Sequence, residues 1–411
     1  MLIRFRFANF HSLRDEQELS LVASLREGRG DLVRVEDLDI DLLRAAAVYG
    51  PNAAGKSNVL SALRFMRNAV VDSHRLWWPE GPIPVEPFLL DAGARDSASL
   101  FEVDLLLDGV RYQYGFKLDT KRIIEEWLYS YPKKRRQLWF SRDADALEPF
   151  AFGKNLKGNH RIIQGLTREN SLFLSAAAEN NHQALLPIHR WFKERLHFSA
   201  AEGRSSDISF TLAMLDSAPK KASVLDLLHL ADLGIADLEI RDDRRPGMYV
   251  YDSAAMPVLE VKHRSREGLV PLPIQRESRG TQAWISLAGT ILWVLERGAV
   301  LFLDELDASL HPRLALEVIR IFQDPERNPR NAQLIFNTHD TTLLGNLMGE
   351  PSLHRDQVWF VEKDQEGASH LYPLTDFKPR KLENLERGYL QGRYGAVPFI
   401  ASQPSLPAAD E

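Results

Sequence analysis

The feature that most constrains the fold of this chain is the octapeptide at 50–57, which reads Gly-Pro-Asn-Ala-Ala-Gly-Lys-Ser. It satisfies the pattern GxxxxGK[ST], a loop whose backbone N–H groups bind phosphate oxygens. Such a loop connects a buried strand to a helix. A segment at 43–49 with the pattern of a short buried strand precedes it, and helical apolar spacing follows at 57–66. A chance glycine-rich turn is the alternative, and the flanking strand and helix make it the weaker interpretation.

Each position of this loop has an expected role in binding a nucleoside triphosphate. Gly50 and Gly55 let the chain curl with its amides inward, and the start of the helix adds a positive dipole end. Lys56 is expected to reach the outer phosphates, and the Ser57 hydroxyl to ligate Mg²⁺. The predicted nucleotide-binding residues of this segment are Gly50, Pro51, Asn52, Ala53, Ala54, Gly55, Lys56, Ser57 and Asn58.

The composition is that of a globular chain and excludes several chemistries. Of 411 residues, 44% are hydrophobic and none is cysteine, so a large core is expected and cysteine-based zinc or redox sites are excluded. The net charge of -6 gives no global attraction to nucleic acid. The alternating start at 1–7 is unlike a signal peptide, and Glu296 and Arg297 interrupt the most apolar region. We expect a cytoplasmic protein without a membrane span.

The order of patterns predicts an α/β fold with a parallel or mixed sheet core. Strand patterns around Asp108-Gly109 and around the basic run 133–136 predict an antiparallel β layer at 85–150. Helical spacing dominates 167–233, and strand signals return at 238–241, 248–251 and 258–261. These changes predict a first nucleotide-binding lobe at 1–165, a helical lobe with a β hairpin at 166–298, a second half of the core at 299–400 and a flexible tail at 401–411.

A second motif, at 299–305, supplies acidic side chains for the same site. Five apolar residues precede Asp304 and Glu305, the pattern of a buried parallel strand that ends in acid at the edge of a sheet. Adjacent acids are common on surfaces, but the strand favours a functional interpretation. We expect Asp304 to hold Mg²⁺ through water and Glu305 to be the general base that polarises the attacking water.

Two further polar positions lie where an anion would be bound. His339 follows a predicted strand at 333–336, and although a lone histidine is more often structural, at a strand end of this sheet we interpret it as a sensor of the γ-phosphate. Ser278 and Gly280 precede a helix with apolar spacing at 281–295, and a helix N-terminus can bind an anion. A merely capped helix start is the alternative for Ser278.

Together these residues resemble the motifs of ABC-type ATPases. The loop at 50–57 is similar to their Walker A motif, Asp304-Glu305 to Walker B, 309–312 to the D-loop, His339 to the switch histidine and 278–282 to the signature loop. The segments 7–12, 277–282, 356–364 and 392–398 further resemble the stand-alone bacterial RloA-type ATPases, relatives of the OLD, RecF and SMC proteins. The resemblance spans nearly the whole chain.

The resemblance implies an ABC-type ATPase head that binds and hydrolyses ATP with Mg²⁺. Two chains would sandwich two ATP molecules as a homodimer, with a higher oligomer as an alternative. Ser278, Gly280 and Gln282 would face the nucleotide of the other protomer, while Lys56, Glu305 and His339 would carry catalysis. The resemblance also implies control of a partner effector, such as a nuclease encoded nearby, in bacterial defence against phage.

Several points stay open at the level of the sequence. No decisive Q-loop glutamine is found: Gln183 is a candidate metal ligand, Asn180 would serve as well, and a polar helix cap explains either. The segment 392–398 would dock either on the core or on a partner. The basic run 133–136 suits a solvated hairpin tip better than a nucleic-acid contact.

Four other functions are weighed against an effector switch. A RecF-like DNA repair or maintenance ATPase that binds DNA is the main alternative, and nucleic acid stays open as a partner. An SMC-like tether is disfavoured because no heptad repeat occurs, and a transporter subunit because of the first β layer and the large insertion. The residues after His339 lack an acidic cluster adequate for a two-metal nuclease.

Overall fold

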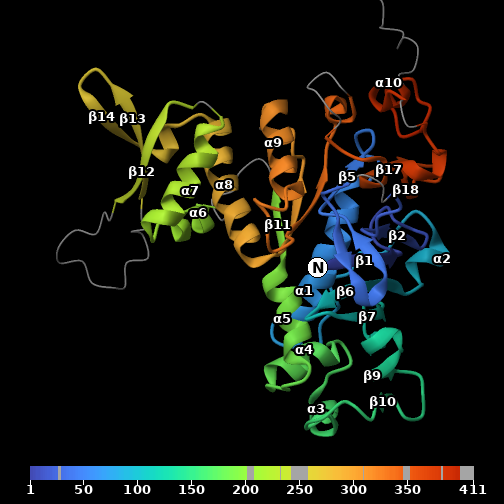
Figure 1. Cartoon of the computed structure of the whole chain (residues 1–411). Helices are drawn as coiled ribbons and strands as arrows, with labels where there is room; N and C mark the ends of the chain where they lie inside the picture. The colour runs from blue at the N-terminus through green and yellow to red at the C-terminus, as the bar shows by residue number, and fades with distance from the viewer. Residues whose placement is uncertain are drawn as a thin grey trace, which may run out of the picture.

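The described part of the chain forms two large sheets with helices between and beside them, and a smaller lobe of helices and strands (Figure 1). The computed structural model describes residues 1–25, 29–200, 208–231, 233–241, 258–308, 310–345, 352–380 and 383–398. Within these residues no helix combines the length and the apolar character needed to cross a membrane.

The first sheet is antiparallel and contains the N-terminal strand. In the described residues its strand order is β10-β9-β8-β7-β6-β1-β2. The bounds are Leu2–Ala8 (β1), Gln17–Ser20 (β2), Ser99–Leu107 (β6), Val110–Leu118 (β7), Ile123–Ser130 (β8), Gln137–Asp143 (β9) and Phe150–Phe152 (β10). Asp108 and Gly109, with φ of 49° and 76°, form the turn between β6 and β7. The predicted antiparallel layer is confirmed, and the basic run 133–136 is its exposed tip between β8 and β9.

The second sheet carries the phosphate loop. Its strand order in the described residues is β11-β15-β16-β5-β17-β18, with every pairing parallel except that of β18. The bounds are Ala45–Tyr49 (β5), Leu196–Ala200 (β11), Val300–Asp304 (β15), Gln333–Asn337 (β16), Val358–Lys363 (β17) and Ser369–Pro373 (β18). Because β5, β15, β16 and β17 are parallel, the residues that follow them meet at one edge of the sheet. The predicted α/β fold with a mixed sheet core is confirmed.

Alternation along the core strands divides their side chains between two apolar clusters. Val48 and Phe302 belong to the cluster that contains the apolar side of helix α1 (Lys56–Asp72) and the antiparallel sheet. Leu301 and Phe336 belong to the cluster that contains helices α8 (Arg279–Arg297) and α9 (Pro312–Gln323). Both faces of these strands are therefore buried, which explains why their sequences are continuously apolar.

The stretch expected to be helical from 167 to 233 is divided by a strand of the core sheet. Helices α3 (His160–Leu166), α4 (Phe173–Glu179) and α5 (Leu186–Arg195) precede β11, and helices α6 (Ile208–Met214) and α7 (Ala218–His229) follow it. Phe198 of β11 stacks on Phe302 with ring centroids 4.6 Å apart. Helices are present where helical spacing was found, but the strand between them was not predicted, because five residues are too few for a strand pattern to be distinguished from a helical one.

A three-stranded antiparallel sheet lies beside α6, α7 and α8 (Figure 1). Its strands are Ile235–Arg241 (β12), Val258–Ser265 (β13) and Gly268–Pro273 (β14). The predicted strands at 238–241 and 258–261 are confirmed, and the one expected at 248–251 lies outside the described residues. Strand β14 was not predicted, and Pro271 and Pro273 explain why, since proline occurs in sheets chiefly at edges.

The C-terminal segment docks on the core sheet. Tyr394 is buried, and its ring stacks on that of Phe360 in β17 at 5.9 Å. The Tyr372 hydroxyl donates to the Tyr394 carbonyl at 3.0 Å, and the Ala396 N–H donates to Glu362 at 3.1 Å. Of the two placements left open for 392–398, the structure shows docking on the core. The other short strands and α-helices of the described residues are Val33–Val35 (β3), Ile40–Leu42 (β4), Ala92–Arg95 (α2) and Leu385–Leu390 (α10).

Candidate nucleotide-binding site

The phosphate loop is held in a shape that only glycine permits at its two glycine positions. Gly55 has φ of 108°, and a Cβ there would lie 2.4 Å from the Ser369 hydroxyl oxygen. A Cβ on Gly50 would lie 2.2 Å from the Val361 carbonyl oxygen of β17. Both contacts are far shorter than real Cβ contacts, so a side chain at either position would displace the loop.

The loop borders a cavity of about 530 Å³ at the carboxyl edge of the parallel sheet. Its lining residues are Asn52, Ala53, Ala54, Gly55, Lys56, Ser57, Asn58, Glu305, His339 and Lys363. The structure therefore brings most of the predicted loop residues together with the predicted base and the predicted sensor. Gly50 and Pro51 contribute through their backbone, since their carbonyl groups lie beside the Lys56 ammonium.

Lys56 is buried at the first position of α1, where its ammonium has three partners. Its Nζ donates to the carbonyls of Gly50 at 2.8 Å and Pro51 at 3.1 Å, and it lies 2.9 Å from Nε2 of His339. Burial lowers the pKa of Lys56 to about 8, although nearby carboxylates oppose the change. Burial and the charge of Lys56 also lower the pKa of His339, so a neutral imidazole is positioned to accept from the ammonium.

The oxygen atoms expected to hold Mg²⁺ lie next to each other. The Ser57 hydroxyl donates to Oδ1 of Asp304 at 3.0 Å, and the Asn337 amide donates to the same oxygen at 2.5 Å. A hydroxyl and a carboxylate at the mouth of a cavity suit Mg²⁺, which takes few protein ligands and keeps several waters. Ser57 and Asp304 therefore fit the ion.

Glu305 begins the turn after β15 in an unusual backbone conformation. Its φ is 55°, a value rarely adopted by a residue with a side chain, and its N–H donates to Oδ1 of Asn337. Asn337 is fully buried and also bonds to Asp304, so one amide group fixes both acidic residues. A strained conformation held by a buried partner is typical of functional positions.

The loop that carries His339 is held by Asp307. The carboxylate of Asp307 accepts from the Thr338 hydroxyl at 2.6 Å and from the His339 N–H at 3.2 Å. Asp307 lies two residues before the segment 309–312 that resembles a D-loop, and Ser309 of that segment lies outside the described residues. The geometry links the residues after β15 to those after β16.

Two serines far apart in the sequence support the loop from behind. The Ser369 hydroxyl donates to the Ala54 carbonyl at 2.5 Å, and its oxygen lies 2.7 Å from the Ser12 hydroxyl oxygen. The Asn58 amide donates to Ser12 at 2.7 Å. The N-terminal segment, the phosphate loop and strand β18 are thus connected by one hydrogen-bonded group.

The signature residues lie at the start of α8 and do not line this cavity. The Ser278 hydroxyl accepts from the Thr281 N–H at 3.1 Å, and the Gln282 amide donates to the Glu277 carbonyl at 2.8 Å. Ser278 is exposed and Gly280 is half-buried, so this helix start faces outward.

Gln183 also lies away from the cavity lining. It follows helix α4, is exposed, and donates from its side-chain amide to the Asn181 carbonyl at 3.1 Å. The alternative, Asn180, is the C-terminal cap of α4, where its side-chain amide donates to the Ala176 carbonyl at 2.8 Å. Both side chains make the local contacts expected of polar residues at a helix end.

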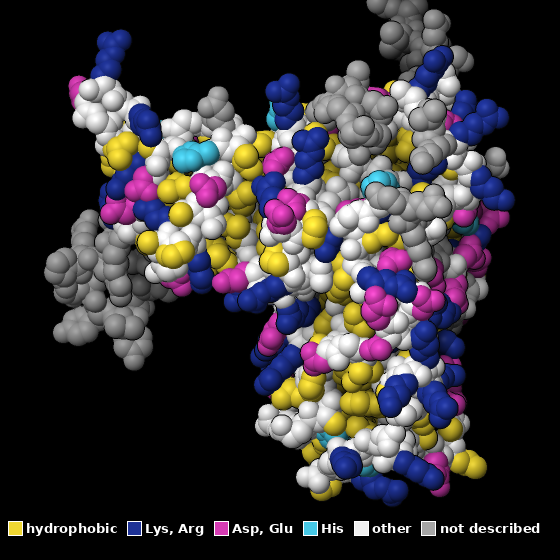
Figure 2. Space-filling view, viewed as in Figure 1, with side chains coloured by type: hydrophobic (Ala, Val, Ile, Leu, Met, Phe, Trp, Pro, Cys, Tyr) yellow, Lys and Arg dark blue, Asp and Glu magenta, His cyan; other side chains and the backbone are white. Residues whose placement is uncertain are grey.

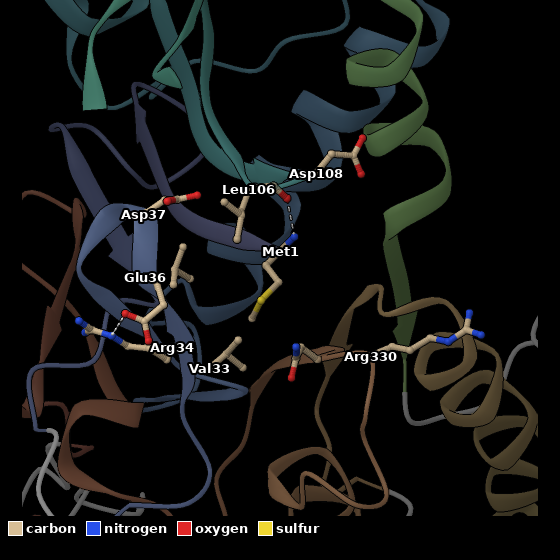
Figure 3. A pocket seen from close by; sticks show the side chains of 11 residues that line it. Met1, Val33, Arg34, Glu36, Asp37, Leu106, Asp108 and Arg330 are labelled. Carbon is tan, nitrogen blue, oxygen red and sulfur yellow. Dashed lines mark hydrogen bonds and ion pairs between the residues drawn. The ribbon is translucent and has the colours of Figure 1, made fainter. Parts of the chain in front are cut away.

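A second cavity, of about 450 Å³, lies elsewhere and differs in character (Figure 3). It is lined by Met1, by Arg34 and Glu36, and by Arg330. Arg330 precedes β16, so this cavity is near the amino edge of the parallel sheet, whereas the phosphate loop is at the carboxyl edge. Its charged lining residues are of both signs, and it contains none of the predicted site residues.

Sequence reasoning missed five polar residues of the site or its support. They are Ser12, Asp307, Asn337, Lys363 and Ser369. Asn337 and Lys363 end strands that carry apolar runs, so a systematic search of strand ends beside the phosphate-loop strand would have found them. The two serines have no comparable signal, because their proximity depends on how the sheets pack.

Among solved structures, heads of SMC proteins are similar to this chain. The SMC head domain from Thermotoga maritima is 13% identical to this chain, with a TM-score of 0.43. The alignment covers 90% of this chain and 98% of that chain. An SMC head bound to the C-winged helix domain of ScpA has 12% identity, coverage of 90% and 96%, and a TM-score of 0.44. An SMC head with an extended coiled coil from Pyrococcus furiosus, bound to the C-terminal domain of ScpA, has 11% identity, coverage of 95% and 98%, and a TM-score of 0.44.

No curated protein matches the sequence. Residues 45–345, which run from the phosphate-loop strand past His339, match the family described as "AAA domain, putative AbiEii toxin, Type IV TA system". Because this match includes the loop, the acidic strand and the histidine and spans most of the chain, the protein belongs to this family of P-loop AAA-domain ATPases.

Proposed function

We propose that this chain is an Mg²⁺-dependent ATPase of the RloA type, converting ATP and water to ADP and phosphate. The observation that carries the proposal is the hydrogen bond between Ser57 of the phosphate loop and Asp304 of the acidic strand, beside Lys56, Glu305 and His339 on one cavity. These are the groups that phosphoryl transfer needs for binding, metal coordination and water activation.

The residues of the site have distinct roles in this reaction. The loop amides and the N-terminus of α1 bind the phosphates, and the Lys56 ammonium moves its hydrogen bonds from the Gly50 and Pro51 carbonyls to phosphate oxygens. Bound Mg²⁺, held by Ser57 and Asp304, would neutralise charge on the β- and γ-phosphate oxygens.

Glu305 acts on the attacking water. Its carboxylate accepts a proton while the water oxygen bonds to the γ-phosphorus, and the bond from that phosphorus to the bridging oxygen of ADP breaks. His339 holds the γ-phosphate from the next strand end. The left-handed backbone at Glu305 and its bond to Asn337 support a fixed direction for this carboxylate.

The chain functions as a switch in which ATP joins two copies. The exposed N-terminus of α8 supports this idea, because Ser278, Gly280 and Gln282 do not line the cavity of their own chain. In the pair they contact the nucleotide held by the other copy. A change from mostly open to mostly closed pairs requires a preference of about 5.5 kcal/mol for the closed form, and two shared γ-phosphates would supply it.

The switch controls a partner effector in the bacterial cytoplasm, such as a nuclease encoded nearby, in antiviral defence. The family description, which names a toxin and a type IV toxin–antitoxin system, supports a defensive role. In this proposal 1–165 and 299–400 form the two halves of the ATPase, and 166–298 presents the signature. The DNA-binding alternative gains no support from the face shown in Figure 2, where basic and acidic side chains are interspersed.

The mass of the assembly, measured with ATP and with ADP, tests whether ATP joins two copies of the chain. The Glu305→Gln chain is expected to form dimers with Mg²⁺ and ATP and to remain monomeric with ADP, since retained γ-phosphate keeps the pair closed. Lys56→Ala, which removes the phosphate contact, is expected to stay monomeric in both. Ser278→Arg separates binding from pairing, because it should bind ATP and fail to dimerise. Monomers of Glu305→Gln with saturating ATP would contradict the sandwich.

A further inference from the structure

Strand β17 places one cation at the nucleotide cavity that the proposed mechanism does not use. Lys363 is the last residue of β17 and lines the cavity together with the phosphate loop. Its side chain is exposed, and among the described residues its ammonium has no hydrogen bond or ion pair within the structure. Lys56, by contrast, is buried and has three partners.

The position of Lys363 relative to the loop is fixed by its backbone neighbours. Across the β17–β18 hairpin Lys363 pairs with Ser369, whose hydroxyl donates to the Ala54 carbonyl of the phosphate loop. Two residues earlier in β17, the carbonyl group of Val361 lies against Gly50 of the phosphate loop. The end of this hairpin therefore lies against the loop at two points.

Alternation along β17 directs Lys363 toward the phosphate side of the sheet. Trp359 and Val361 belong to the apolar cluster of helix α1, whereas Phe360 belongs to the opposite cluster, and Glu362 bonds to the C-terminal segment on that opposite face. Lys363 therefore lies on the same face of the sheet as Trp359 and Val361, which is the face that carries α1.

Sheet order then decides which part of a nucleotide Lys363 meets. Asp304 and His339 follow β15 and β16, which lie on one side of β5, and β17 lies on the other side. If the γ-phosphate is bound between Asp304 and His339, the cation at the end of β17 faces the opposite flank of the loop. That flank holds the part of the nucleotide nearer the ribose.

We propose that Lys363 is a nucleotide-binding residue that contacts the α- or β-phosphate of ATP and ADP alike. This inference rests on the proposed ATPase function. The two cations then have different roles, because Lys56 reaches the outer phosphates, whereas Lys363 contributes charge that does not distinguish triphosphate from diphosphate.

Equilibrium binding of ATP, ADP and GTP to Lys363→Ala tests the assignment. Loss of one charge-assisted hydrogen bond at an open site is expected to weaken all three nucleotides about 5- to 20-fold, by the same factor. Lys363→Arg keeps the charge and should retain most of the affinity. Lys154→Ala, which removes another exposed lysine that does not line the cavity, should leave binding unchanged. His339→Ala should weaken ATP more than ADP.

Three results would overturn the role of Lys363: unchanged affinity in Lys363→Ala, a loss confined to ATP, or a loss that differs between ATP and GTP. The second would place the lysine at the γ-phosphate and the third at the base. Lys56→Ala in the same series keeps the two proposals apart. If the wild-type chain and Lys56→Ala bind nucleotide equally poorly, the ATPase proposal fails, whereas unchanged binding by Lys363→Ala alone removes only this inference.

Discussion

At the scale of single residues, the phosphate loop depends on hydroxyl groups that belong to other parts of the chain. Ser369 donates to the Ala54 carbonyl and lies in hydrogen-bond contact with Ser12, and Ser12 accepts from Asn58. Gly55 leaves the space that these two hydroxyls occupy. The loop amides therefore keep their direction because the carbonyl behind them is held, and not only because the loop contains glycine.

Ser369→Ala is expected to weaken ATP binding about fivefold, because a hydrogen bond of this kind contributes about 1 kcal/mol. The measurement is the dissociation constant for a fluorescent ATP analogue, with the melting temperature recorded for each variant. Ser265→Ala is the matched control, since its hydroxyl also donates to a carbonyl, at 3.0 Å, but in the β13–β14 turn. An unchanged constant for Ser369→Ala, or an equal effect in both variants, would show that the hydroxyl does not support the loop.

Residue-scale prediction from the sequence is most specific where chemistry demands one residue type at one spacing. Gly50, Gly55 and Lys56 could be assigned because the phosphate loop accepts almost no substitutes there. Asn337 could not be assigned in the same way. It orients both acidic residues, yet an asparagine at a strand end has many uses, and only the order of the strands places it beside Asp304.

At the scale of elements, strand β11 is where pattern reading failed and where packing explains the outcome. Its His197 ring contacts Trp293 of α8 edge to face at a centroid distance of 4.1 Å, and its Nε2 lies 3.0 Å from the Glu194 carbonyl. Phe198, on the other face, stacks on β15. A short strand between two helices is thus stabilised by partners distant in sequence, which periodicity within the segment does not reveal.

The environment of β11 predicts a pH dependence of stability. Burial lowers the pKa of His197 to about 4, below its ordinary value of about 6.5. The unfolded chain therefore binds a proton that the folded chain excludes, and stability falls as the pH decreases from 6.5 toward 4. The contribution of His197 at pH 5 should be lower than at pH 7 by about 1–2 kcal/mol.

Denaturant unfolding of wild type and His197→Gln at pH 7 and pH 5 measures this contribution. The glutamine does not titrate, so a change from pH 7 to pH 5 should lower the unfolding free energy of wild type more than that of His197→Gln. His263→Gln is a suitable control, because that histidine pairs with Glu277 at 2.7 Å on another sheet. The same difference between wild type and His197→Gln at both pH values would show that His197 is not kept neutral by the fold.

At the scale of the whole molecule, the strand order unites segments that the sequence keeps far apart. Strands β5, β15, β16 and β17 carry the loop, the acids, the histidine and Lys363 to one edge of a sheet. The fold class and the candidate residues at the ends of β5, β15 and β16 could be predicted, since each of these strands is apolar and leads into a characteristic motif, whereas Lys363 at the end of β17 could not. The division of the helical stretch by β11 and the docking of Tyr394 on β17 required the packed structure.

The central claim, that this edge of the sheet binds and hydrolyses ATP, is tested most directly by phosphate release from Mg²⁺-ATP, measured for wild type beside Glu305→Gln under conditions where both chains are saturated. Both chains should bind ATP with similar affinity, and Glu305→Gln should release phosphate about 10²- to 10⁴-fold more slowly, as expected on removal of a general base. Equal rates of release in the two chains, or a wild-type chain that binds no ATP, would contradict the claim.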